Sequence, residues 1–124
     1  MEIPDLIFTS VQRNVRLFIE VKGVTLESDN IARFPDAPTE RGVKHLKELI
    51  HCMQEGYEAY LLLVIQMKGV DRFEPNWGTH REFGETLQEA ERAGVHILAY
   101  DCLVEPDRME IHDPVPVCLA SDWK

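Results

Sequence analysis

Apolar stretches alternate with polar turns along the first third of the chain, and this pattern predicts strands. Residues 6–11 and 15–24 are two apolar-rich runs joined by the polar residues 12–14, so we expect a β-hairpin there. Residues 24–34 are expected to form a second, looser hairpin that turns around residues 28–30. The chain therefore opens with antiparallel strands.

The apolar pattern of the second half predicts further strands. The continuous apolar run 59–66 is typical of a central strand that is covered on both faces of a sheet. Residues 95–104 form another apolar run, and 109–111 are expected to form a short edge strand after the turn at Pro106 and Asp107. Residues 114–117 are expected to be an extended tail, and 68–78 a loop.

Two segments have the apolar spacing of helices. The first runs over 40–55, can be capped by Asp36 or Thr39, and ends at a glycine; its apolar residues at helical spacing are Val43, Leu46, Ile50 and Met53. The second runs over 80–93 and also ends at a glycine. Thr79 is its expected cap, with Glu82 three residues later in capping-box spacing.

The resulting order is β-β-β-α-β-α-β-β. The hairpin-linked strands are antiparallel, and the later β-α-β unit should be parallel with a right-handed crossover. The sequence thus predicts an α/β fold, a mixed β-sheet flanked by helices on its faces. A chain of 124 residues corresponds to one domain, residues 1–124.

The composition limits the function classes. The formal net charge of -9 opposes non-specific binding to phosphates, so a nucleic-acid role would need local basic clusters, a bound divalent metal or a partner domain. No apolar run approaches the roughly 20 residues that span a bilayer, and the first residues lack the features of a signal peptide. We therefore expect a cytoplasmic protein with no membrane partner.

The sequence Glu20-Val21-Lys22 carries the most specific chemistry. Glu20 and Lys22 are two apart on an expected strand and so point to the same face. Asp5 lies upstream, with fourteen residues (6 to 19) between it and Glu20. Asp5, Glu20 and the Val21 carbonyl could bind Mg²⁺ or Mn²⁺, and Lys22 could hold a water or stabilise charge on a phosphate. The alternative is a solvated Glu-Lys pair and a turn aspartate.

The start of the first helix offers groups for nucleic-acid binding. A phosphate can bind the free N–H groups of a helix N-terminus, and the candidate contacts there are Thr39, Arg41, Lys44 and His45. Capping and an ordinary exposed helix face explain the same residues. Gln66, at the end of the central strand, could reach the periphery of the same site or could satisfy loop backbone.

Several longer motifs indicate a family. The stretches 19–26 (IEVKGVTL), 34–42 (FPDAPTERG) and 94–100 (GVHILAY) closely resemble the bacterial sugar fermentation stimulation protein A family. The resemblance implies a two-part protein: an N-terminal OB-fold-like domain, absent here, and a C-terminal domain resembling the PD-(D/E)xK, or restriction-endonuclease-like, fold. This chain matches the C-terminal part. Asp5, Glu20 and Lys22 carry over as the catalytic set of that fold.

The resemblance implies a DNA-binding protein that regulates sugar (maltose) metabolism genes and carries a divalent-metal site. The first alternative is an active Mg²⁺-dependent nuclease that acts on DNA or RNA, and the second is an interaction module without chemistry. Whether the chain is an enzyme, a metal-dependent phosphodiesterase, is left open. The edge strand expected near Met109 could pair with a second copy, which would give a homodimer.

Overall fold

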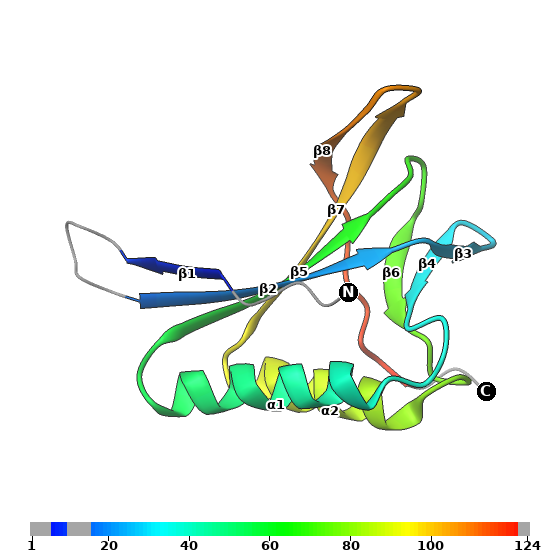
Figure 1. Cartoon of the computed structure of the whole chain (residues 1–124). Helices are drawn as coiled ribbons and strands as arrows, with labels where there is room; N and C mark the ends of the chain where they lie inside the picture. Colours follow the sequence, from blue (N-terminus) through cyan, green and yellow to red (C-terminus); the bar gives the residue numbers. More distant parts are fainter. Residues whose placement is uncertain (1–5, 10–15, 122–124) are drawn as a thin grey trace.

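The computed structural model describes residues 6–9 and 16–121 (Figure 1). Its elements follow in the order β1 (Leu6–Thr9), β2 (Arg16–Val24), β3 (Leu26–Ser28), β4 (Ile31–Phe34), α1 (Glu40–Gln54), β5 (Glu58–Ile65), β6 (Arg72–Pro75), α2 (Arg81–Arg92), β7 (His96–Glu105) and β8 (Arg108–Pro114). This is the α/β fold that the sequence predicts. The expected turn at 12–14 and the residue Asp5 lie outside the described residues.

The strands form two sheets. The larger has five strands in the order β1-β2-β5-β7-β8, and the smaller has three in the order β3-β4-β6. The pair β1–β2 and the pair β7–β8 are antiparallel, whereas β2–β5 and β5–β7 are parallel. The prediction of a mixed sheet with a parallel β-α-β unit is therefore confirmed.

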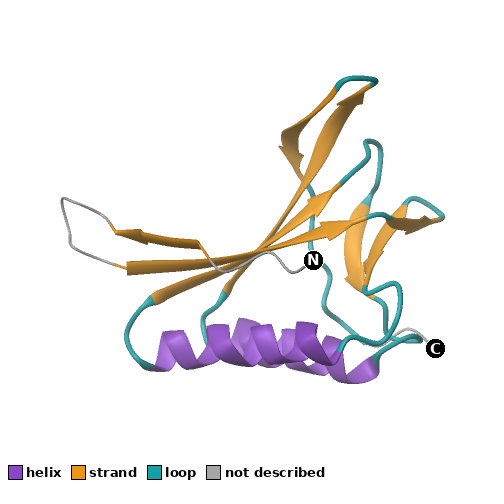
Figure 2. Cartoon of the chain, viewed as in Figure 1, coloured by secondary structure: helices purple, strands orange, loops and turns teal. Residues whose placement is uncertain are grey.

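Both helices cover the same face of the large sheet (Figure 2). On β5, the residues that face the helices are buried, and those between them are only half-buried. The predicted helices do flank the sheet, but the prediction that 59–66 is covered on both faces is wrong for the described part of the chain. The less covered face includes Tyr60, Leu62 and, on β7, Leu98. An unbroken apolar sequence concealed this alternation.

Helix α1 begins and ends close to the predicted residues. The Thr39 hydroxyl accepts a hydrogen bond of 2.9 Å from the Gly42 backbone N–H, which caps the helix. The chain leaves the helix at Gly56, whose φ of 91° lies in the region that favours glycine. The helix buries Leu46 and Leu49 against the sheet, and this packing holds its inner face next to β2 and β5.

The start of α2 differs from the prediction. His80, and not Thr79, is the cap residue, and its side chain makes no capping hydrogen bond. Instead its Nδ1 accepts a hydrogen bond of 3.1 Å from the Thr39 N–H, which joins the two helix starts. Close packing also fixes this corner, because a Cβ on Gly84 would lie 2.5 Å from the Trp77 ring.

The segment expected to be a loop contains a strand. Within 68–78, β6 pairs in parallel with β4, and the isolated bridge from Phe73 to Val117 ties the C-terminal tail to it. Phe73 is fully buried, whereas Arg72 and Glu74 on either side are only half-buried. This short alternation is a strand signal that the surrounding glycines and prolines obscured. The hairpin β3–β4 is as predicted, and its turn holds Asp29 and Asn30 at φ 54° and 64°.

Candidate metal centre

Strand β2 directs Glu20 and Lys22 toward α1. The β2–β5 register pairs Glu20 with Leu61 and Lys22 with Leu63, and both leucines are buried on the helix-covered face. Glu20 is therefore carried into the core, where it is only 1% exposed. The same-face placement expected from the sequence is confirmed by this register.

Lys22 and His45 surround the Glu20 carboxylate. The Lys22 Nζ lies 3.4 Å from Glu20 Oε2, and the His45 Nδ1 lies 3.2 Å from the same oxygen. The Lys22 Nζ is also 2.8 Å from the His45 Nδ1. An ammonium can only donate, so this contact makes Nδ1 the acceptor. The Nδ1 lone pair is then directed at Lys22, and Nδ1 has no proton to donate to Glu20.

The Glu20 carboxylate is therefore poorly satisfied. Among the described residues, neither of its oxygens accepts a hydrogen bond, although the ammonium of Lys22 lies within ion-pair distance. A buried carboxylate without hydrogen bonds costs several kcal/mol relative to a solvated one. A divalent cation is the kind of group that such a carboxylate binds, and so the donor set fits one.

The structure says less about the other residues predicted to bind the metal or to lie at the edge of its site. Asp5 lies outside the described residues. Val21 is in β2 between Glu20 and Lys22, in register with Leu62. Gln66 follows β5, and its Nε2 lies 2.6 Å from where a Cβ on Gly23 would be. Strand alternation puts that position on the face opposite Lys22, so the structure does not bring Gln66 to Glu20.

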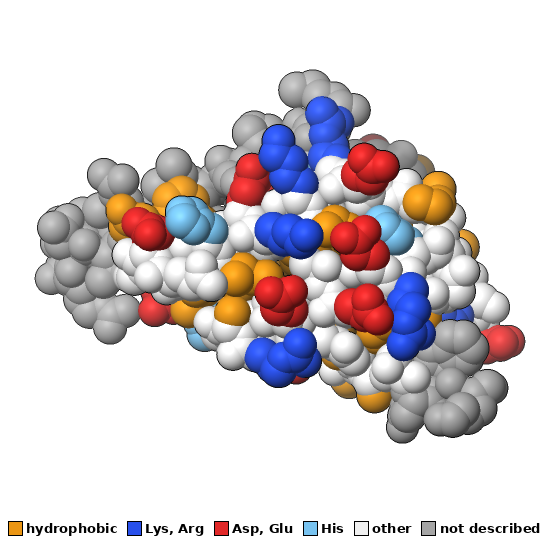
Figure 3. All heavy atoms as spheres, turned by 90° about the horizontal axis from the view of Figure 1, so that it is seen from below, with side chains coloured by type: hydrophobic (Ala, Val, Ile, Leu, Met, Phe, Trp, Pro, Cys, Tyr) orange, Lys and Arg blue, Asp and Glu red, His pale blue; other side chains and the backbone are white. Residues whose placement is uncertain are grey.

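The predicted nucleic-acid contacts do not form one surface. Thr39 caps α1, and His45 faces Glu20. Arg41 is exposed and lies one helical turn before His45, on the same side of α1. Lys44 instead lines a groove on the outer side of the helices together with Lys47 and the acidic residues Glu40, Glu48 and Glu82. The helical underside of the molecule displays basic and acidic side chains intermixed (Figure 3).

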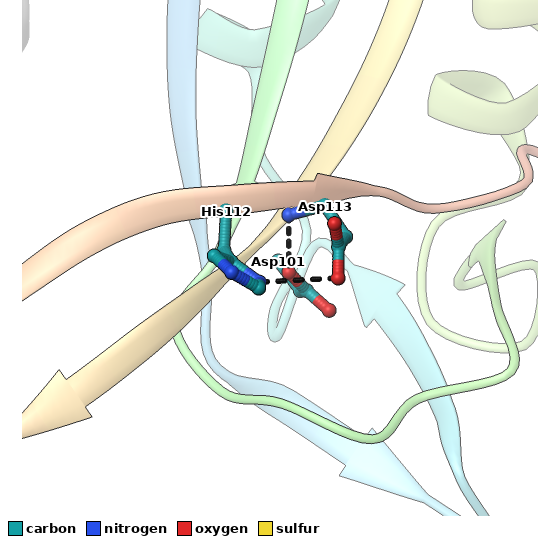
Figure 4. A group of neighbouring side chains, drawn as sticks. All are labelled: Asp101, His112 and Asp113. Atoms are coloured by element: carbon teal, nitrogen blue, oxygen red, sulfur yellow. Dashed lines mark hydrogen bonds and ion pairs between the residues drawn. The ribbon is translucent and has the colours of Figure 1, made fainter.

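A second cluster, which is not among the predicted site residues, joins β7 to β8. Asp101, His112 and Asp113 bring their ligand atoms within 4.8 Å of one another (Figure 4). Asp101 is buried, and its Oδ1 accepts a hydrogen bond of 2.8 Å from the Asp113 backbone N–H. Counting residues back from the turn at 106–107 would have placed 101 opposite 112, so the hairpin register was the available signal.

Lys68 already occupies this second cluster. Its Nζ lies 2.8 Å from Asp113 Oδ2, 3.2 Å from Asp101 Oδ2 and 2.6 Å from His112 Nδ1. The hydrogen bond with Asp113 is the main cause that raises the pKa of Lys68, and the same bond lowers the pKa of Asp113. The lysine thus supplies the positive charge that these carboxylates require.

A family model confirms the resemblance of the sequence. The model described as the sugar fermentation stimulation protein RE domain matches residues 4–108. The chain belongs to the sugar fermentation stimulation protein family. Within the part of this family member that the structure describes, neither α1 nor α2 is long and apolar enough to cross a membrane.

Relatives of this family member are close in sequence but about twice as long. The sugar fermentation stimulation protein homolog of Clostridium beijerinckii is 61% identical over 107 residues, which are 86% of this chain and 47% of the relative. The homolog of Desulfitobacterium hafniense is 56% identical over 106 residues, 86% of this chain and 46% of the relative. The chain therefore spans about half the length of the curated relatives that it matches.

A solved structure shares the fold. The structure of Pyrococcus furiosus SfsA in complex with Ca²⁺ superposes with a TM-score of 0.82 and 28% sequence identity. The match covers 90% of this chain and 48% of that chain. The fold found here, a mixed sheet with helices packed on it, is consistent with the nuclease-like core that the sequence predicts.

Proposed function

We propose that this chain is a cytoplasmic DNA-binding domain of the sugar fermentation stimulation family that acts through a divalent cation, Mg²⁺ or Mn²⁺, at Glu20. The observation that carries the proposal is the buried Glu20 carboxylate, which accepts no hydrogen bond from the described residues. The Pyrococcus furiosus relative, solved in complex with Ca²⁺, supports binding of a divalent cation in this fold. The family name supports a role in the regulation of sugar metabolism.

Each residue of the proposed site has its own chemical role. Glu20, with Asp5 and the Val21 carbonyl, would hold the cation through oxygen ligands. When bound, the cation supplies a positive charge that polarises a phosphate and lowers the pKa of a water bound to it. Lys22 lies 3.4 Å from Glu20 and would stabilise negative charge on a phosphate next to the cation.

The nucleic acid would approach this site past the start of α1. Arg41, which is exposed and lies one turn before His45, would contact a phosphate beside Glu20. Thr39 would support nucleic-acid binding by fixing the helix start, and Lys44 would attract the nucleic acid by its charge at longer range. The acidic residues near Lys44 make the outer helix groove a poor nucleic-acid surface.

An active nuclease is the second candidate function. The observation that favours it is the closeness of Lys22 to Glu20, because a lysine beside a metal carboxylate can stabilise the transition state of phosphodiester cleavage. The third candidate is an interaction module without chemistry, in which a second copy pairs with the exposed edge strand β8.

Two measurements test the proposal. Titration calorimetry with Mn²⁺ should give micromolar to millimolar binding to the wild type and none at this site in Glu20→Ala; identical heats would remove the metal site. Oligonucleotide binding in Mn²⁺ should be weaker in Glu20→Ala than in the wild type. If the wild type cleaves DNA and Lys22→Ala does not, the nuclease function is favoured. If the wild type binds DNA but does not cleave it with any divalent metal, the nuclease function is removed.

A further inference from the structure

His45 belongs to the Glu20 site and not to an outer nucleic-acid surface. Its side chain is 13% exposed, and its Nδ1 lies 3.2 Å from Glu20 Oε2 and 2.8 Å from Lys22 Nζ. The helix α1 that carries it buries Leu46 and Leu49 on the neighbouring positions, which turns this side toward the sheet. A ring nitrogen that accepts a hydrogen bond from Lys22 thus lies beside the buried Glu20 carboxylate.

The distance between His45 and Glu20 fits two ligands of one cation. Donors about 2.1 Å from a cation and at right angles to one another lie about 3 Å apart. The Nδ1 and Oε2 atoms are 3.2 Å apart. The Lys22 ammonium, in contact with both, has the position and charge of a cation between them. The same two groups could therefore hold a metal if the ammonium moved aside.

We propose that the Nδ1 of His45 is a ligand of the cation held by Glu20. The inference rests on the proposed function, to which it adds a nitrogen ligand beside the oxygen ligands. Imidazole favours transition metals, whereas Mg²⁺ and Ca²⁺ prefer carboxylates, carbonyls and water. His45 therefore makes the site select Mn²⁺ over Mg²⁺ and Ca²⁺.

Three substitutions on α1 separate the roles of this side chain. His45→Asn puts an amide oxygen near the place of Nδ1, so it can still accept a hydrogen bond from Lys22 but offers no nitrogen lone pair. His45→Ala removes both functions. His51→Asn changes an exposed histidine on the same helix and is the matched control for the loss of an imidazole.

The test uses Mn²⁺ alone, with no nucleic acid. Calorimetry should show Mn²⁺ binding about tenfold or more weaker in His45→Asn, with Mg²⁺ binding changed by less than about threefold. Pulsed electron paramagnetic resonance of the Mn²⁺-loaded protein should show coupling to a directly bound nitrogen in the wild type and in His51→Asn. The coupling should be absent in His45→Asn.

Glu20→Gln distinguishes the two possible failures. In the first failure, Glu20→Gln removes Mn²⁺ binding, but the wild type shows no nitrogen coupling or His45→Asn binds Mn²⁺ as the wild type does. His45 is then no ligand, and the proposed function stands. If the wild type binds no Mn²⁺, or Glu20→Gln binds it as well as the wild type does, both proposals fail. Unchanged Mn²⁺ binding in Glu20→Gln would assign the ion to other groups, such as Asp101, His112 and Asp113.

Discussion

Two clusters in this protein bring a lysine together with a histidine and with one carboxylate (Glu20) or two (Asp101 and Asp113), yet they differ in how the carboxylates are satisfied. At the second cluster, Asp101 accepts a backbone N–H and Lys68 bonds to both aspartates. At the first, the buried Glu20 accepts no hydrogen bond from the described residues and relies on Lys22 at 3.4 Å. A count of acidic and histidine ligands favours the second cluster as the metal site, whereas burial and the unsatisfied carboxylate oxygens favour the first.

The largest effect that separates the clusters should be stabilisation by metal. An ion at about 100 times its dissociation constant stabilises a folded protein by about 2.7 kcal/mol, which raises Tm by roughly 10 °C for a domain of this size. We expect Mn²⁺ to produce this rise in the wild type and in Asp113→Asn but not in Glu20→Gln, measured by differential scanning calorimetry within each variant. A rise kept by Glu20→Gln and lost by Asp113→Asn would reverse the comparison.

A smaller effect should come from removing each lysine. In Lys22→Met the ammonium no longer competes for the Glu20 carboxylate, so Mn²⁺ affinity should increase on the order of tenfold. Lys68→Met is the matched control, because Lys68 also contacts a histidine and carboxylates but belongs to the second cluster, and it should leave the Mn²⁺ affinity of the Glu20 site unchanged. Titration calorimetry measures both. Weaker Mn²⁺ binding in Lys22→Met would mean that Lys22 supports the cation and does not compete with it.

The smallest effect should be the pH dependence of the stability that the second cluster contributes. Lys68 lowers the pKa of Asp113 below its ordinary value of 3.8, so the folded state favours the ionised carboxyl. The stability that it contributes is present above the ordinary pKa and is lost as the pH falls through the lowered one. The Tm difference between the wild type and Asp113→Asn should therefore vanish in acid. Because Asp113 is 61% exposed, the difference should be small and should shrink with salt.

Local sequence signals predicted the elements whose ends are chemically marked. Helix α1 was predictable because Thr39 caps it and Gly56 ends it. The strand β6 was not, because four residues with two charges stand among turn-forming residues and depend on pairing with β4. The choice of His80 over Thr79 at the start of α2 depends on a hydrogen bond to Thr39, 41 residues away, which no local pattern contains.

The candidate site was predictable only where a local pattern determines it. Strand alternation alone put Glu20 and Lys22 on one face, and the β2–β5 register agrees. The helix-start pattern predicts His45 as a nucleic-acid contact on an exposed face, although its position four residues before the buried Leu49 indicates the inner side of α1. The approach of His45 to Glu20 depends on how α1 packs across β2, which is a tertiary property.

The mixed-charge underside of the helices limits how this protein could hold nucleic acid. A surface of closely spaced lysines and arginines displaces many counterions from a phosphate backbone, and its affinity falls steeply with added salt. Here basic and acidic side chains alternate over the outer helix face (Figure 3), so few counterions would be released there. For a strand held at Glu20, affinity would follow the supply of divalent ions more closely than the sodium or potassium concentration.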